Sequence, residues 1–253
     1  SLSIESKSVD LSRRHLMLNL RGLSFREYLL MNHQIDLDIY TLDQIISRHE
    51  DISYEIYQKT KEIKIDLIDQ FHVYLREGYF PSRLDYISVW QYYQSLLNSM
   101  SKVVEEDIFL SRDGIDKQSI QNMKRLLRHI SAKCPFIPNI SELSRSLSIA
   151  SDNSLKKYLF LLSEADILRN LYRHDKSHRD FPRPEKVFLE NSNYMYAHTT
   201  DAEIGNVRET FIANALSKNH NITAPRQADF LVDDRYHFEV GERSKKKRQI
   251  KNI

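Results

Sequence analysis

Long amphipathic stretches with very few helix-breaking residues are the feature that most constrains the fold of this chain. Its 253 residues include five glycines and six prolines, and both residue types destabilise the interior of a helix. Apolar side chains recur at helical spacing in several segments, as at Leu67, Phe71 and Leu75. We therefore expect a mainly α protein with a C-terminal α/β part. The strands of that part are expected where apolar residues alternate, at 222–224, 228–232 and 236–240.

Composition excludes some classes of protein and leaves others open. The hydrophobic content of 41% is ordinary for a globular domain, and the formal net charge of +2 selects no class of partner by itself. A single cysteine, Cys134, allows no disulfide within the chain, which suits a reducing compartment. No apolar run approaches the roughly 20 residues that a membrane-spanning helix needs. We expect a cytoplasmic protein with no membrane partner.

The region 24–114 is expected to be entirely helical. Ser24 has the features of an N-cap, with Glu27 three residues later to complete a capping box, and Thr41 is expected to cap the next helix. A long helix is predicted over 61–77, with Gly78 as its C-cap and Pro81 as its stop. An aromatic stripe in 85–99 is expected to be core; it includes Ile87, Trp90, Tyr92, Tyr93, Leu96 and Leu97.

The region 115–190 shows the order of elements that is typical of a winged helix. Three helices are predicted and two strands follow them, with a long polar loop between the strands. The helices are expected at 118–131, 140–147 and 154–165, and the strands at 167–172 and 186–190.

In a winged helix the third helix enters the DNA major groove and the wing contacts phosphates. The expected wing, 169–186, has three more basic than acidic residues. The alternative, to which the sequence gives equal support, is a wing that contacts only other proteins. His174 and His178 are four residues apart but lie in a predicted loop, so no metal site is expected there. The candidates for nucleic-acid binding are Lys156, Lys157, Arg169, Arg173 and Arg179.

Several phrases of the sequence resemble one known family when they are taken in order. They are DLSRRHLMLNLRGLSFREYL at 10–29, HVYLREGYFP at 72–81, residues 154–167, VRETFIANAL at 207–216 and ADFLVDDRYHFEVG at 228–241. Together they resemble prokaryotic AAA+ ATPases that carry an uncharacterised C-terminal domain. The resemblance covers most of the chain.

The resemblance implies four parts. Residues 1–23 would be the remnant of the AAA+ core, 24–114 the helical lid, 115–190 the winged helix, and 191–253 an incomplete restriction-endonuclease-like domain. By the same resemblance, Arg13 or Arg14 would reach the terminal phosphate of the nucleotide.

The sequence contains no phosphate-binding loop, which requires G-x-x-x-x-G-K-[ST]. Its glycines are Gly22, Gly78, Gly114, Gly205 and Gly241, and none precedes a lysine. We therefore expect ATP and magnesium to be cofactors of the full-length protein only. This chain alone is expected to bind neither and to have no ATPase activity.

The last part resembles a nuclease core in which carboxylates hold magnesium and a lysine assists ionisation of the attacking water. Carried over residue by residue, the carboxylates are Glu209, Asp229 and Glu239, and the lysine position is occupied by Gly241. We therefore expect a degenerate site without metal and without nuclease activity. A three-residue loop at 233–235 would place Asp229 opposite Glu239, whereas a two-residue loop would send the two acids to opposite faces.

Three functions are compatible with these patterns. The first is the C-terminal portion of an AAA+ ATPase that couples ATP use to remodelling of nucleic acid or of a protein. The second is a non-enzymatic winged-helix regulator that binds nucleic acid. The third is a magnesium-dependent nuclease. The expected partner is accordingly DNA or another protein.

Overall fold

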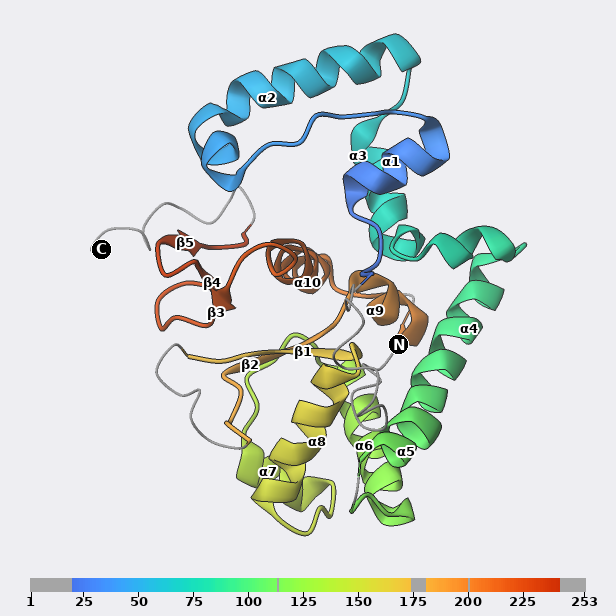
Figure 1. The fold of residues 1–253 in the computed structure, drawn as a ribbon, viewed down its shortest axis with the longest axis vertical. Helices are drawn as coiled ribbons and strands as arrows, with labels where there is room; N and C mark the ends of the chain where they lie inside the picture. The colour runs from blue at the N-terminus through green and yellow to red at the C-terminus, as the bar shows by residue number, and fades with distance from the viewer. Residues whose placement is uncertain (1–19, 113, 174–180, 200, 242–253) are drawn as a thin grey trace, which may run out of the picture. The chain divides into compact units, whose positions relative to one another are not determined.

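The computed structural model describes residues 20–112, 114–173, 181–199 and 201–241 (Figure 1). The protein is mainly helical, with small antiparallel sheets in its C-terminal part, as predicted. The chain divides into two compact units between Val89 and Trp90. We call them the N-terminal unit and the C-terminal unit. This division lies inside the range 24–114 that the sequence assigned to a single helical lid.

The N-terminal unit consists of three α-helices and two shorter helical segments. The α-helices are α1 (Phe25–His33), α2 (Leu42–Ile63) and α3 (Leu67–Val73). They are followed by a π-helical turn, η1 (Tyr74–Gly78), and a 3-10 segment, η2 (Pro81–Asp85). Capping boxes at Ser24 and Thr41 are both present, as predicted. The extended segment 34–41 runs alongside α2 (Figure 1), and Lys59 of α2 forms an ion pair with its Asp38 at 2.7 Å.

The prediction of a single helix over 61–77 is wrong. The helix α2 continues to Ile63 and ends at Lys64, which adopts a left-handed conformation with φ 57°. A new helix then begins because the carboxylate of Asp66 accepts hydrogen bonds from the backbone N–H groups of Ile68 and Asp69. Local capping therefore overrides the continuous apolar periodicity.

Gly78 is not a left-handed C-cap, which corrects the second prediction for this segment. It lies inside η1, and Tyr79 after it is right-handed helical. A Cβ atom at this position would lie 2.7 Å from the ring of Tyr28 and 2.9 Å from that of Tyr74. Glycine is needed here because two aromatic rings pack against the backbone.

Aromatic rings form the core of the N-terminal unit. The ring centroids of Phe25 and Phe71 are 5.1 Å apart, and those of Tyr28 and Tyr74 are 5.5 Å apart. The hydroxyl of Tyr74 donates a hydrogen bond to the carbonyl oxygen of Leu23 at 2.7 Å. Burial raises the pKa of Tyr74 well above its ordinary value, so the ring remains neutral.

The C-terminal unit begins at the second residue of α4 (Val89–Lys102). The π-helical turn η3 (Val103–Asp107) and α5 (Ile108–Ser111) follow. Tyr92, Leu96 and Met100 are buried on one face of α4. Trp90 is 69% exposed and Ile87 is 97% exposed, so the aromatic stripe is only partly core. Trp90 lies two residues from Tyr92 on the helix and therefore points away from the buried face.

Three helices and a hairpin follow in the predicted order. They are α6 (Lys117–Ser131), α7 (Ile140–Ser146), α8 (Asp152–Glu164), β1 (Leu168–Leu171) and β2 (Lys186–Leu189). The strands are antiparallel, with Leu168 opposite Leu189 and Leu171 opposite Lys186. The side chains of α8 and of the hairpin supply much of the core, including Leu155, Leu159, Leu162, Val187, Phe188 and Leu189.

The last part contains two helices and a second sheet. The helices are α9 (Ser192–His198) and α10 (Ile204–Leu216), and the sheet has the order β3 (Ile222–Thr223), β4 (Phe230–Val232), β5 (Tyr236–Phe238). Phe230 and Phe188 are fully buried, with ring centroids 5.9 Å apart. This contact packs β4 against β2. In the part of the chain that the structure describes, no helix is both long and apolar enough to cross a membrane.

Candidate functional site: a lysine between two carboxylates

Three charged side chains from different elements meet in the C-terminal unit. The ammonium group of Lys186, at the start of β2, donates a hydrogen bond to Oε1 of Glu209 in α10. It also lies 3.5 Å from Oδ1 of Asp229, which directly precedes β4. Their side chains are 19%, 14% and 31% exposed, respectively. We call this group the Lys186 cluster.

Packing of the neighbouring apolar residues brings the Lys186 cluster together. Lys186 and Phe188 are two residues apart on β2 and therefore project from the same face of the strand. The ammonium group lies 5.6 Å from the centroid of the Phe188 ring, which in turn packs on Phe230. Asp229 is the residue before Phe230, so the aromatic contact also places the carboxylate beside the lysine.

Hydrogen bonds to the backbone hold Asp229 in position. Its second carboxylate oxygen, Oδ2, accepts a hydrogen bond from the N–H of Val240 at 2.8 Å. Its own N–H donates to the carbonyl oxygen of Phe238 at 3.0 Å. Asp229 is therefore tied to the end of β5 as well as to Lys186.

The structure selects between the two loop lengths that the sequence allowed. Val232 pairs with Tyr236, so the loop contains three residues, and the register continues to place Asp229 opposite Glu239. Asp233 and Asp234 have φ values of 51° and 54°; aspartate tolerates this left-handed region better than most residues do.

The predicted nuclease-like residues are only partly brought together. Glu209 and Asp229 meet through Lys186, whereas the side chain of Glu239 is exposed and forms no hydrogen bond or ion pair with another described residue. Gly241, the last residue described, contributes no side chain. Magnesium would need several oxygen ligands around an open position, and here an ammonium group lies between the two carboxylates. This arrangement does not fit a magnesium site. The described residues include no group of three or more His, Cys, Asp or Glu side chains that could hold a metal ion.

Lys186 is the residue whose role the sequence reasoning missed, because it was counted among the cations of the expected wing. One signal was present in the sequence. Lys186 shares the parity of Phe188 in a predicted strand, and a lysine on the same face as a large apolar residue is often half-buried and paired.

The arginines proposed for nucleic-acid binding on the hairpin are bound within the protein. Arg169 forms an ion pair with the buried carboxylate of Glu190, with side chains 15% and 8% exposed. Arg173 pairs with Glu185 at 3.2 Å. Each guanidinium thus has a carboxylate partner within the chain. Contact of Arg169 and Arg173 with nucleic acid stays a prediction. Arg179, His174 and His178 lie outside the described residues.

The two lysines proposed on the third helix are more accessible. Lys156 and Lys157 are half-buried on α8, and neither forms an ion pair with another described residue. Asp152 in the first turn is engaged by the hydroxyls of Ser141 and Ser144, and these hydrogen bonds lower its pKa. With Asp152 and Glu164 at its two ends, α8 carries no net charge.

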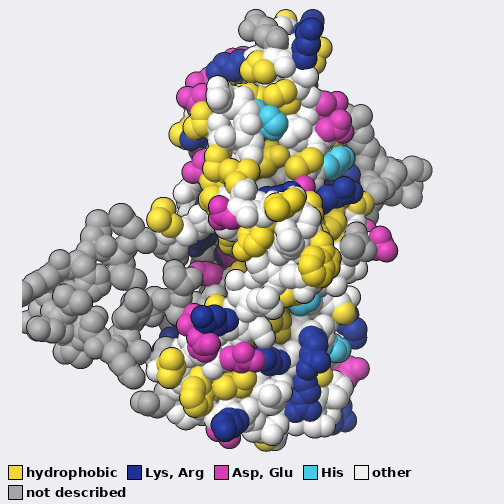
Figure 2. Space-filling view, turned by 90° about the vertical axis from the view of Figure 1, so that its right-hand side faces the viewer, with side chains coloured by type: hydrophobic (Ala, Val, Ile, Leu, Met, Phe, Trp, Pro, Cys, Tyr) yellow, Lys and Arg dark blue, Asp and Glu magenta, His cyan; other side chains and the backbone are white. Residues whose placement is uncertain are grey.

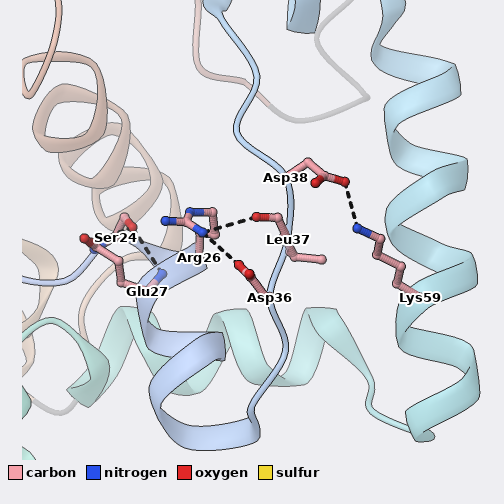
Figure 3. Close-up of polar contacts among 7 residues, drawn as sticks. All are labelled: Ser24, Arg26, Glu27, Asp36, Leu37, Asp38 and Lys59. Carbon is pink, nitrogen blue, oxygen red and sulfur yellow. Dashed lines mark hydrogen bonds and ion pairs between the residues drawn. The ribbon is translucent and has the colours of Figure 1, made fainter.

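The phrase LSFREYL, which contributes to the family resemblance, has structural roles in this chain (Figure 3). Ser24 and Glu27 cap α1 reciprocally, and Arg26 donates to the carboxylate of Asp36 and to the carbonyl oxygen of Leu37. Tyr28 and Leu29 are buried. These contacts account for the phrase without a ligand. Arg13 and Arg14, the arginines proposed to contact nucleotide phosphate, lie outside the described residues.

Comparison with known proteins adds no relative: no protein-family model, no curated protein and no solved structure matches this chain.

Proposed function

We propose that this chain is a non-catalytic, partner-binding portion of an AAA+-type ATPase. The nucleotide-binding core would supply ATP hydrolysis, and the C-terminal unit would engage the partner that is remodelled. The Lys186 cluster is the observation that carries the non-catalytic part of this proposal. The ammonium group of Lys186 lies between Glu209 and Asp229 and compensates their negative charges. A catalytic magnesium ion would have to occupy the same place.

The distribution of cations favours a protein as the partner. A nucleic-acid interface depends on Lys and Arg side chains that are free to displace counterions from phosphates. On the hairpin, Arg169, Arg173 and Lys186 each have an internal carboxylate partner. Breaking those pairs to reach DNA would cost the contacts that join the two sides of the hairpin at Arg169 and Arg173, and the contact of Lys186 with α10.

A nicking assay on supercoiled plasmid tests the non-catalytic assignment. We expect no cleavage with magnesium or with manganese, because the carboxylates are paired with Lys186. Cleavage that is lost in Asp229→Ala would refute the proposal and support a nuclease. Cleavage that persists in Asp229→Ala would be assigned to a contaminating enzyme, since the same preparation lacks a carboxylate of the site.

A second candidate, a non-enzymatic nucleic-acid-binding regulator, is favoured by Lys156 and Lys157 on α8. Fluorescence anisotropy with a labelled DNA duplex at low salt distinguishes it from the first. Under this candidate, log affinity falls with log salt by about 0.9 per phosphate contacted, and Lys156→Ala with Lys157→Ala reduces that slope by about two contacts. Under our proposal the wild-type chain does not bind the duplex, and the double variant behaves identically.

A further inference from the structure

Two clefts in the C-terminal unit meet at the side chains of Arg128 and His198, which line both. The first cleft, about 350 Å³, lies among α4, η3 and α6. The second, about 360 Å³, lies between the C-terminal half of α6 and residues of 195–199 and 201–206. Each has the volume of a small-molecule site. None of the sequence predictions and no part of the proposed function involves these clefts.

The first cleft combines an apolar floor with a basic rim. Leu97, Met100 and Val104 line the floor. Leu97 is half-buried and supplies its accessible apolar surface, whereas Met100 and Val104 are buried beneath it. Lys124 and Arg128, one helical turn apart on α6, supply the rim. Figure 2 faces the side of the molecule on which α4 lies in Figure 1, and it shows Lys and Arg side chains grouped beside apolar ones.

Arg128 is the cation that remains available at this rim. Lys124 is paired with Glu105 of η3. Arg128 is exposed, and its single hydrogen bond to another described residue runs from Nε to the carbonyl oxygen of Lys124 at 3.4 Å. Its terminal guanidinium nitrogens are therefore free to form a forked contact with an anionic group.

His198 provides a second polar group that needs a partner. Its Nε2 atom is buried and forms no hydrogen bond with any described residue, and a buried unsatisfied nitrogen costs free energy unless something binds it. Burial lowers the pKa of His198, which keeps the imidazole neutral. His198 therefore adds no charge to the border of the two clefts.

The second cleft determines which way such a molecule would lie. Asp201 and Glu203 line it, and the carboxylate of Glu203 already caps α10 by accepting from the N–H groups of Gly205 and Asn206. These acids disfavour an anion on that side. We propose that the first cleft is a binding site for a small amphipathic organic anion, with its apolar body against the floor at Leu97 and its anionic group on Arg128.

Fluorescence titration with 8-anilinonaphthalene-1-sulfonate tests this site, because the probe has an aromatic body and one sulfonate. We expect saturable binding with one probe per chain, and an affinity about tenfold lower in Arg128→Gln. Gln121→Glu, a change at an exposed position of the same rim, should also weaken binding because it adds a repelling carboxylate. The matched control Arg145→Gln alters an exposed arginine of α7 that lines neither cleft and should leave the affinity unchanged.

A neutral probe separates anion recognition from simple apolar binding. N-phenyl-1-naphthylamine has the same aromatic body without the sulfonate, so it should bind more weakly and should not respond to Arg128→Gln. The proposal is overturned if the sulfonate probe shows no saturable binding at millimolar concentration. It is also overturned if that probe binds wild type, Arg128→Gln and Gln121→Glu with equal affinity. Circular dichroism verifies that each variant is folded. If Arg128→Gln does not fold, the affinity of Gln121→Glu decides the outcome.

Discussion

Lys186 has the largest consequences of any single residue, because its one positive charge serves two carboxylates. Glu209 and Asp229 would otherwise face each other, largely buried, as like charges. Removing one partner of a buried ion pair is strongly destabilising, since it leaves uncompensated charge in a medium of low dielectric constant.

We predict that Lys186→Met, which keeps the length of the side chain and removes the ammonium group, lowers the free energy of unfolding by about 2 kcal/mol. This is below the usual cost for a fully buried pair because the cluster is partly exposed. Urea denaturation at neutral pH measures it. Manganese should restore stability in Lys186→Met, because the two carboxylates can then bind the ion and a ligand of the folded state stabilises it.

The control for this prediction is Lys157→Met on α8, which removes a lysine without an ion pair and should change stability by no more than about 0.5 kcal/mol. Equal stability of Lys186→Met and wild type would show that the cluster contributes nothing. Equal stabilisation of both proteins by manganese would place the ion elsewhere.

At the scale of elements, the hairpin of β1 and β2 is held by charged pairs on its flanks as well as by its apolar face. Arg169 on β1 reaches Glu190 just beyond β2, and the amide of Asn214 in α10 donates to the backbone oxygen of Glu190 at 2.9 Å and to its side chain at 3.1 Å. Arg173 pairs with Glu185 outside the strands, where its side chain is 33% exposed. Each arginine thus pairs with one carboxylate, but the pair of Arg169 is more buried than the pair of Arg173.

This difference in depth gives a matched pair of variants. Arg169→Met should lower the free energy of unfolding by about 3 kcal/mol, because it strands the buried Glu190 carboxylate. Arg173→Met should cost at most about 1 kcal/mol, because water can partly replace the guanidinium at this pair, whose side chains are 33% and 18% exposed. Chemical denaturation of both variants measures the contrast. If the two variants lose the same free energy of unfolding, the burial of Glu190 does not determine how much its ion pair stabilises the hairpin.

At the scale of the whole molecule, the division between Val89 and Trp90 separates two cores of different composition. The N-terminal unit is organised around stacked and edge-on aromatic rings. The C-terminal unit is organised around aliphatic side chains of α6, α8 and the hairpin. A chain with two separate cores does not have to unfold in a single transition.

We predict two calorimetric unfolding transitions that respond to different substitutions. Gly78→Ala should lower only the transition of the N-terminal unit, by about 1–3 kcal/mol, because the added methyl group overlaps the rings of Tyr28 and Tyr74. Lys186→Met should lower only the other transition. A single transition that both substitutions shift equally would show that the two cores unfold together.

Much of the secondary structure could be predicted from the sequence because it depends on neighbours along the chain. Ser24 and Thr41 cap helices through residues three positions away, and short strands alternate where apolar residues do. The failures are also local in origin. The sequence around Lys64 and Asp66 was interpreted as continuous helix because apolar periodicity persists through a break that two residues create.

The sequence by itself determined a mainly helical chain, the order of its elements and the residue types that could form a site. Only the tertiary structure decided which charges meet. In the sequence, Arg169, Arg173 and Lys186 are cations of one expected wing with no visible partner. In the structure, packing brings a carboxylate to each of them. Asp229 and Glu239 were candidates for the same site, and one is bound to Lys186 while the other is exposed. The physical reason is that burial and pairing of a charge depend on contacts between elements distant in sequence, which local periodicity does not encode.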